Sequence, residues 1–99
     1  MRIGSMAVFY MGDGSTVTFS SPGLLTYIGV VASEFRPGTA LRNGVMTVNV
    51  GGVVQQGYMQ VSTLGVLRIG LGLDAGGNLT NFPAGTVAVM DTTVTYTLY

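Results

Sequence analysis

Apolar and polar residues alternate with a period of two along several segments of this chain. The alternation is clearest in the last segment, residues 91–99, where Val94, Tyr96 and Leu98 alternate with threonines. Such a pattern places the apolar side chains on one face of an extended chain and predicts a half-buried β-strand. It also predicts strands over residues 15–20, 45–50 and 57–63. The side chains expected to face a core there are Val17, Phe19, Met46, Val48, Val50, Met59 and Val61.

Two further segments complete the predicted strands. Residues 24–33 are nearly all apolar, which is typical of a strand buried on both faces. Residues 66–71 carry Leu67, Ile69 and Leu71 on one face and Arg68 on the other. No window shows the apolar stripe of an amphipathic helix, and 16 glycines and 3 prolines interrupt the chain. The chain is therefore predicted to contain strands and no helix.

Clusters of Gly, Pro, Asn and Asp separate these segments and predict turns, because these residues favour turn conformations. Asn43-Gly44 supplies the positive φ angles of a tight turn. Spacings of about 8–12 residues between turns favour a sandwich. We expect a single all-β domain over residues 1–99, an antiparallel, jelly-roll-like β-sandwich of about seven to nine short strands. The other predicted turns are residues 11–14, 21–23, 36–38, 51–52, 74–78 and 83–85.

Charge is scarce, and this changes what we expect at the surface. Only 8% of residues are charged, against about 25% in an average protein, and the net charge is zero. A small domain exposes much of its surface, and a monomer usually keeps that surface charged. We therefore expect copies of the chain to cover part of it; the alternative is a neutral, Thr-rich surface that is soluble as it stands. The charged residues are Arg2, Arg36, Arg42, Arg68, Asp13, Glu34, Asp74 and Asp91.

The composition also argues against several kinds of chemistry. The chain has no Cys and no His, so it lacks disulfides, Cys-based zinc sites and the commonest general base. Four scattered arginines at zero net charge do not suit nucleic acid, and no apolar run of about 18 residues predicts membrane insertion. We expect no metal and no catalytic residue. A glycan hydrolase with two carboxylates stays a distant alternative, because strand ends bring distant acids together.

Two short motifs have ordinary explanations. Residues 70–75 match the G-x-G-x-x-A pattern of dinucleotide-binding sites, which needs a helix directly afterwards to hold the pyrophosphate. Gly76-Gly77 and then Pro83 follow instead, so we expect a loop and no cofactor. Residues 78–80 match the N-glycosylation acceptor pattern, which is short enough to arise by chance.

A series of short motifs runs from Phe35-Arg36-Pro37 to the C-terminus. It continues through residues 45–50, 57–61, 64–69 and 82–86 to the final Val-Thr-Tyr-Thr-Leu over 94–98. In this order the motifs resemble the C-terminal head domain of bacteriophage receptor-binding and tail-fibre proteins; residues 1–22 have no counterpart in that pattern. The resemblance implies a homotrimer of β-sandwich heads in a virion, in contact with other virion proteins.

Heads of this family often attach to glycans of the bacterial surface, so the resemblance implies a non-enzymatic adhesion domain. The alternative is a purely structural virion component, such as a fibre tip or trimerisation cap without a ligand. For a glycan site we expect the loop over residues 74–81, with Asp74, Asn78 and Asn81, and Arg68 or Tyr58 nearby. Tyr58 offers a stacking face for sugars, and Arg68 offers a planar fork for an anionic sugar or phosphate. Arg68 would equally suit an ion pair across a subunit interface.

Overall fold

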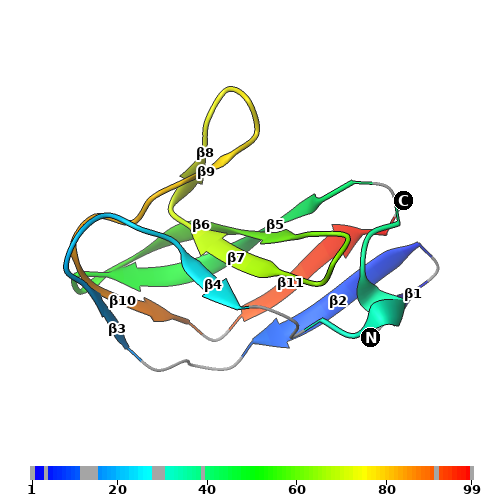
Figure 1. The fold of residues 1–99 in the computed structure, drawn as a ribbon. Coiled ribbons are helices and arrows are strands. Elements are labelled where there is room, and N and C mark those ends of the chain that lie inside the picture. Colours follow the sequence, from blue (N-terminus) through cyan, green and yellow to red (C-terminus); the bar gives the residue numbers. More distant parts are fainter. Residues whose placement is uncertain are drawn as a thin grey trace.

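The computed structural model describes residues 2–3, 5–11, 16–27, 31–38, 40–90 and 92–98. These residues form eleven β-strands and one short 3-10 helix, and none of them lies in an α-helix. Every strand pairing between them is antiparallel. Figure 1 shows the strands forming a curled β-structure from which one hairpin projects. The predicted all-β, antiparallel class is therefore confirmed.

The strands form three sheets. The largest has the order β3-β10-β5-β6-β7-β4, the second the order β1-β2-β11, and the third is the projecting hairpin β8–β9. The bounds are β1 (Arg2–Ile3), β2 (Met6–Met11), β3 (Val17–Phe19), β4 (Leu25–Tyr27), β5 (Arg42–Val50), β6 (Val53–Val61), β7 (Leu67–Gly70), β8 (Gly72–Leu73), β9 (Leu79–Thr80), β10 (Gly85–Val89) and β11 (Thr92–Thr97).

The hairpin of β5 and β6 forms the centre of the six-stranded sheet. Its two strands pair over nine residues each, from Arg42 opposite Val61 to Val50 opposite Val53. Gly51 and Gly52 close it with φ angles of 59° and 92°, which favour glycine. The Asn49 side chain accepts a hydrogen bond of 2.9 Å from the Gly52 amide and holds this turn. The predicted turn at residues 51–52 is confirmed.

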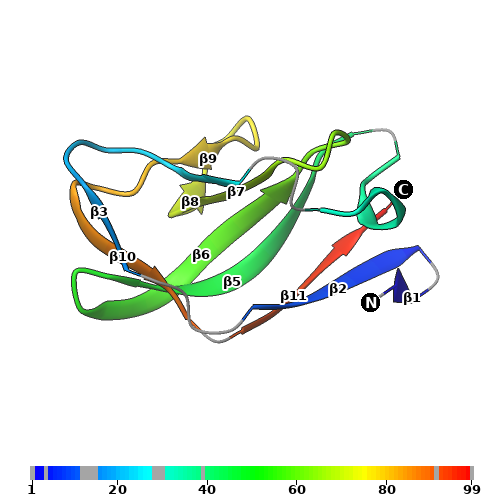
Figure 2. The ribbon, with the colours of Figure 1, turned by 60° about the horizontal axis from the view of Figure 1, so that its bottom comes forward.

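The two larger sheets meet where β11 packs against β5. The chain leaves β10 through Met90, whose amide donates to the Thr47 carbonyl of β5 at 3.1 Å. It then enters β11, which pairs with β2 in the other sheet, as Figure 2 shows. At Gly44 an added Cβ would collide with the Val94 side chain and lie 3.0 Å from the Thr95 carbonyl oxygen. A residue without a side chain therefore lets the two sheets approach.

Buried side chains of both sheets form one apolar cluster. The core-facing positions predicted by alternation are confirmed for Met46, Val48, Met59 and Val61, which are at most 1% exposed. On β11 the alternation also holds, with the threonines exposed between buried neighbours. The cluster contains Ala7, Leu25, Val31, Met46, Val48, Met59, Val61, Leu67, Ile69, Phe82, Val87, Val89, Val94, Tyr96 and Leu98.

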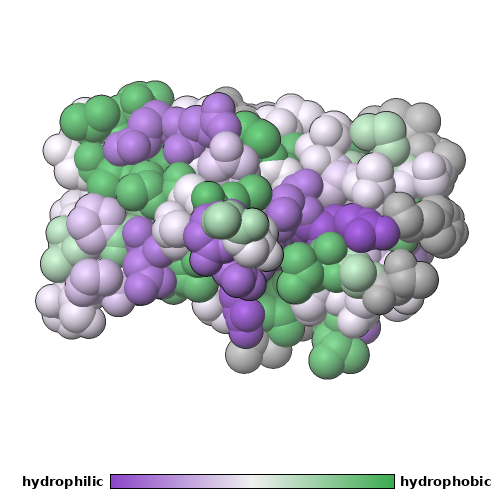
Figure 3. All heavy atoms as spheres, turned by 90° about the horizontal axis from the view of Figure 1, so that it is seen from above, coloured by the Kyte–Doolittle hydropathy of each residue, from purple (hydrophilic) through white to green (hydrophobic). Residues whose placement is uncertain are grey.

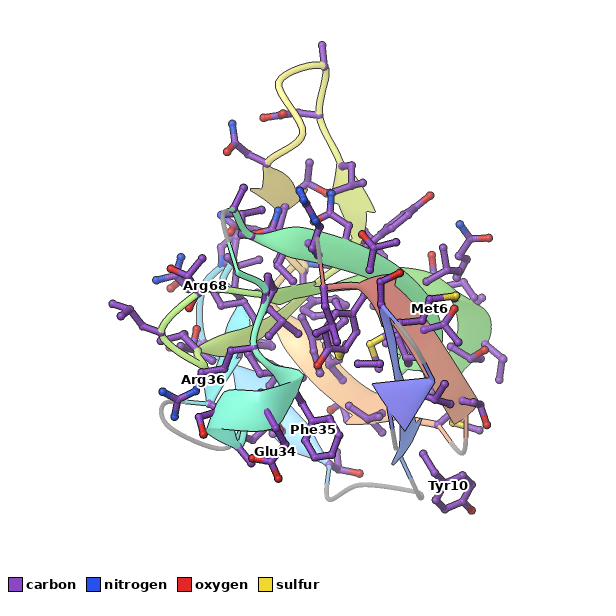
Figure 4. All side chains as sticks on the ribbon, turned by 90° about the vertical axis from the view of Figure 1, so that its right-hand side faces the viewer. Met6, Tyr10, Glu34, Phe35, Arg36 and Arg68 are labelled. Atoms are coloured by element: carbon purple, nitrogen blue, oxygen red, sulfur yellow. The ribbon has the colours of Figure 1, made fainter. Side chains whose placement is uncertain are left out.

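The 3-10 helix η1 (Ser33–Phe35) and the Arg-Pro that follows it are fastened to the core. The Tyr96 hydroxyl of β11 donates to the Phe35 carbonyl at 2.7 Å. The Arg36 Nε donates to the Val31 carbonyl at 2.8 Å, and its guanidinium lies where a Cβ of Gly65 would project. Figure 4 shows Phe35 and Arg36 on this helical turn. The Phe-Arg-Pro motif therefore ties a connecting segment to β11 and to the β6–β7 turn.

Two of the sequence-based predictions are wrong in detail. Asn43-Gly44 forms no turn and lies inside β5, opposite Gln60 and Met59. Its glycine serves the approach of β11 rather than a positive φ. Residues 24–33 do not form one strand buried on both faces. β4 is a three-residue edge strand with Thr26 and Tyr27 exposed, because β7 is the one described strand that pairs with it.

The sequence patterns also missed elements. β2 lies in a continuous apolar run without alternation, and its partner β11 is distant in sequence. β10 follows a predicted turn but was not recognised as a strand. The described residues form eleven strands, more than the seven to nine expected. The excess comes from β1, β8 and β9, which have only two residues each and are too short to show a pattern in the sequence. Residues 12–14 of one predicted turn lie outside the described residues.

Substitution of Gly44 should destabilise the fold. Gly44→Ala places a methyl group against Val94 and the Thr95 carbonyl, so we expect the free energy of unfolding to fall by about 1–3 kcal/mol. Urea unfolding measures the loss. The matched control is Gly76→Ala in the β8–β9 turn, where the nearest side-chain atom lies 3.3 Å from the added Cβ. Equal stability of the two variants would show that β11 does not need the glycine.

The Tyr96 hydroxyl should make stability depend on alkaline pH. Burial raises the pKa of Tyr96 from 10.0 to about 12. Its contribution is complete below pH 10, where the unfolded chain also keeps the proton, and is lost as the pH rises through 12. We therefore expect the free energy of unfolding to fall over this range, and to fall less in Tyr96→Phe. The control is Tyr27→Phe, which removes an exposed hydroxyl; an unchanged slope in Tyr96→Phe would contradict the assignment.

Candidate functional site

The outer face of the six-stranded sheet carries a row of polar side chains. The strand register places Thr26 of β4 opposite Arg68 of β7, Arg68 opposite Gln60 of β6, and Gln60 opposite Asn43 of β5. Directly opposite residues share a face and have Cβ atoms about 4.5–5.5 Å apart. We call these four residues the polar row. They bring hydrogen-bonding groups from four strands together across the sheet.

One hollow on this face includes Gln60 and Arg68. It has a volume of about 220 Å³, and we call it the arginine hollow. Its lining joins the ends of β6 and β7 to the turn between them. The Ser62 Oγ accepts hydrogen bonds from the Leu64 and Val66 amides at 3.2 and 3.0 Å, which fixes that turn. The lining residues are Leu41, Gln60, Ser62, Leu64, Val66 and Arg68.

A second hollow lies where β11 passes β5. Its volume is about 380 Å³, and we call it the tyrosine hollow. The Tyr58 hydroxyl accepts a hydrogen bond of 2.8 Å from the Gln56 side-chain amide, which restrains the ring. Leu73 of the projecting hairpin adds an apolar wall. The lining residues are Asn43, Gly44, Val45, Tyr58, Leu73, Thr93 and Thr95.

The β8–β9 hairpin lines the tyrosine hollow with Leu73, contacts Gln60 of the arginine hollow, and is held by Asp74. The Asp74 Oδ1 accepts hydrogen bonds from the amides of Gly76 at 2.9 Å and Asn78 at 3.0 Å. The Gly77 carbonyl accepts a hydrogen bond of 3.0 Å from the Gln60 side-chain amide. This bond leaves Gln60 only 9% exposed although it lies on the outer face. Asp74 therefore shapes the loop that positions Gln60.

The arginines divide by role. Arg36 binds the Val31 carbonyl, and the buried Nε of Arg42 has no hydrogen-bond partner among the described residues. The Arg2 side chain lies outside the described residues. The Arg68 side chain is exposed and makes no hydrogen bond or ion pair within the part of the chain that the structure describes. Figure 4 shows it well separated from Glu34. Its guanidinium is available to a ligand or a partner.

The five residues expected from the sequence do not gather in one place. Arg68 lines the arginine hollow and Tyr58 the tyrosine hollow. Asp74 caps its own turn, while Asn78 and Asn81 are exposed and line neither hollow. The hollows lie on the sheet face, not on the loop over residues 74–81. That segment forms a turn followed by β9 rather than a cleft.

Sequence reasoning missed several polar residues of the hollows, Gln60 and Asn43 among them. Gln60 was not named among the expected site residues, and Asn43 was assigned to a turn. Alternation already predicts that Gln60 points away from the face that carries Met59 and Val61. In the same way it predicts that Arg68 points away from the face that carries Leu67 and Ile69. Only the register between β5, β6 and β7 aligns Asn43, Gln60 and Arg68 in one row.

Other candidate chemistry finds no support in the described residues. No three of their His, Cys, Asp and Glu side chains gather as a metal site, and Asp13 and Asp91 lie outside the described part of the chain. The segment over 70–75 leads from β7 into the β8–β9 hairpin, not into the helix that a dinucleotide site needs. Among the described elements, no helix has the length and apolar character to span a membrane.

Comparison with known proteins adds no relative. No family model, no curated protein and no solved structure matches this chain.

Loss of the Asp74 carboxylate should loosen the hairpin turn. Asp74→Ala removes the acceptor of the Gly76 and Asn78 amides, and a bond to a charged group is worth about 1.5–3 kcal/mol. We expect these amides to exchange with solvent about tenfold faster or more, as measured by NMR hydrogen exchange. Asp74→Asn keeps a side-chain oxygen acceptor and serves as the matched control. Unchanged exchange in the alanine variant would show that the carboxylate does not hold the turn.

Proposed function

We propose that this chain is a bacteriophage head domain that attaches a virion to a carbohydrate of the bacterial surface without modifying it. In this proposal it is a homotrimer that contacts other virion proteins. Its two larger sheets are the layers of a jelly-roll-like β-sandwich. Packing of β11 against β5, and the shared apolar cluster, support such layering.

The observation that carries the proposal is an apolar surface with almost no charge. Large exposed apolar side chains on a small domain mark surfaces that bind another molecule or another copy. Figure 3 shows apolar residues in patches between polar ones on the face from which the hairpin projects. The exposed large apolar side chains among the described residues are Met6, Tyr10, Tyr27, Leu41, Val45, Val53, Val54 and Leu64.

The motifs that resemble phage heads occupy positions on which the fold depends. Phe35 and Arg36 are tied to Tyr96 and Val31, and Phe82 is fully buried against Phe19, with ring centroids 6.0 Å apart. Residues in such positions define a scaffold rather than a receptor specificity. The resemblance therefore supports a shared architecture, and it supports adhesion only through that architecture.

The two hollows support a carbohydrate as the ligand. Sugars present apolar C–H faces and hydroxyl groups, and binding sites for small molecules combine apolar walls with a few placed polar groups. The arginine hollow offers Leu64 and Val66 with Gln60 and Arg68, and the tyrosine hollow offers Val45 with Tyr58. Both are shallow surface features that suit a chain of sugars better than a buried substrate.

The second candidate is a purely structural virion component without a ligand. The placement of Tyr58 and Arg68 in different hollows, and the use of Asp74 within its own turn, favour this candidate. A trimerisation cap would need the exposed apolar side chains and no receptor site. The two candidates share the homotrimer and differ in glycan binding.

The trimer is tested by the mass of the protein in solution. Light scattering behind a sizing column should give a mass three times the 10.3 kDa of one chain. This is expected because burial between copies removes exposed apolar area from water, at about 25 cal/mol per Å². Val54→Arg introduces a charge at an exposed apolar position and should lower the measured mass. Thr18→Arg introduces the same charge at an exposed polar position and, as the control, should leave the mass unchanged. A monomeric wild-type chain would contradict the proposed trimer.

Adhesion is tested with an array of bacterial surface polysaccharides. The protein should bind a subset of them, and no reducing sugar should appear on prolonged incubation. Binding to none of the polysaccharides would refute adhesion and favour the structural component. Release of reducing sugar would instead reveal a hydrolase.

A further inference from the structure

We infer that the arginine hollow binds an acidic sugar unit, a glycan residue whose single carboxylate or phosphate group pairs with Arg68. This inference rests on the proposed adhesion function and names the chemical class of its ligand. It commits to the arginine hollow and to the polar side chains of Arg68, Gln60 and Ser62. The shared chemistry is an oxyanion on a sugar-like body, and the experiment below separates the two sources of that oxyanion.

Arg68 is the group that selects an anion. Of the other arginines, the part-buried Nε of Arg36 is bound to the Val31 carbonyl, and the Nε of Arg42 is buried without a partner among the described residues. Arg68 is exposed in the hollow, and no described acid pairs with it. A guanidinium presents a planar fork that binds a carboxylate or phosphate through two parallel hydrogen bonds. The hollow therefore carries an unused positive charge on a nearly uncharged face.

Gln60 and Ser62 supply neutral groups of fixed position beside that charge. The Gln60 side-chain amide is held by the Gly77 carbonyl at 3.0 Å, and this leaves its oxygen as an acceptor for a sugar hydroxyl. The Ser62 Oγ already accepts two backbone amides, and its own hydrogen remains to be donated. Because both side chains are already anchored, binding costs little additional ordering.

The remaining walls suit the carbon skeleton of a sugar. Leu41 and Leu64 are 49% and 77% exposed, and they lie with Val66 in the same lining as Arg68. Such side chains contact C–H groups and remove them from water. A volume of about 220 Å³ is below the roughly 300 Å³ of the smallest drug-sized sites. The hollow therefore fits one sugar unit, with Thr26 extending the polar row beyond Arg68.

The test is an NMR titration of the full chain with three probes at millimolar concentration. The probes are trigalacturonate, its methyl ester and glycerol phosphate. We expect trigalacturonate or glycerol phosphate to shift the side-chain signals of Arg68 and Gln60. The methyl ester, which has the same sugars without the charge, should leave those signals in place. Shifts with the first probe indicate a sugar carboxylate, and shifts with glycerol phosphate alone indicate a phosphate.

Variants locate the charge. Arg68→Gln should weaken binding of the anionic probe about tenfold or more, and Arg68→Lys should recover only part of it, because lysine keeps the charge and loses the fork. Thr18→Gln, on an exposed position of β3 outside both hollows, is the matched control and should bind as the wild type does. Unchanged mass and unfolding temperature show that each variant is folded.

Three results would overturn the inference. They are equal binding of the methyl ester, shifts confined to the tyrosine hollow, and no response to either anionic probe. None of these outcomes decides whether the protein is an adhesin, because the polysaccharide array tests that independently. If the wild type and Arg68→Gln bind the polysaccharide array equally well, the proposed adhesion function stands and the acidic-sugar site is rejected. Loss of the homotrimer in Arg68→Gln would likewise reject it and assign Arg68 to an ion pair between subunits.

Discussion

The close passage of β11 over β5 at Gly44 is the constraint on which the rest of the structure depends. β10 belongs to the six-stranded sheet and β11 to the three-stranded sheet, so the chain must cross from one to the other within a few residues. Gly44 allows the crossing because it places no side chain between β5 and Val94. The crossing brings Val94 and Tyr96 onto the apolar cluster, and Tyr96 in turn fastens Phe35. The absence of a side chain at Gly44 therefore allows the contacts that join the two sheets, the apolar cluster and the Phe-Arg-Pro segment.

Because the inner face of the six-stranded sheet packs into this core, the polar side chains that could bind a ligand lie on its outer face. There the β8–β9 hairpin acts through a short series of hydrogen bonds. Asp74 closes the turn, the Gly77 carbonyl accepts from Gln60, and Gln60 is thereby held beside Arg68. An acid that resembles a ligand-binding residue in the sequence is thus a structural residue that positions another side chain. The proposed acidic-sugar site depends on this support as much as on its arginine.

Because charge is scarce, individual ionic groups among the described residues can be assigned separate roles. Arg36 and Asp74 satisfy backbone groups, which is the use expected of isolated charges in a small fold. Arg68 differs because it stands on an exposed sheet face with apolar neighbours. In a chain with abundant lysine and glutamate its charge would be one among many. Here it is a strong electrostatic feature of the outer face, and this is why a single substitution tests the proposal.

Local sequence determined the β-class, the inward positions Met46, Val48, Met59 and Val61, and the turn at Gly51-Gly52, because alternation and turn chemistry act over a few residues. Tertiary structure alone decided that Gly44 is a crossing point, that β2 pairs with β11, and that Arg68 and Tyr58 line different hollows. Each of these depends on which strands become neighbours and in which register. Strand neighbours and register depend on the total apolar area buried between segments that are far apart in the chain. A local sequence pattern contains no information on that area.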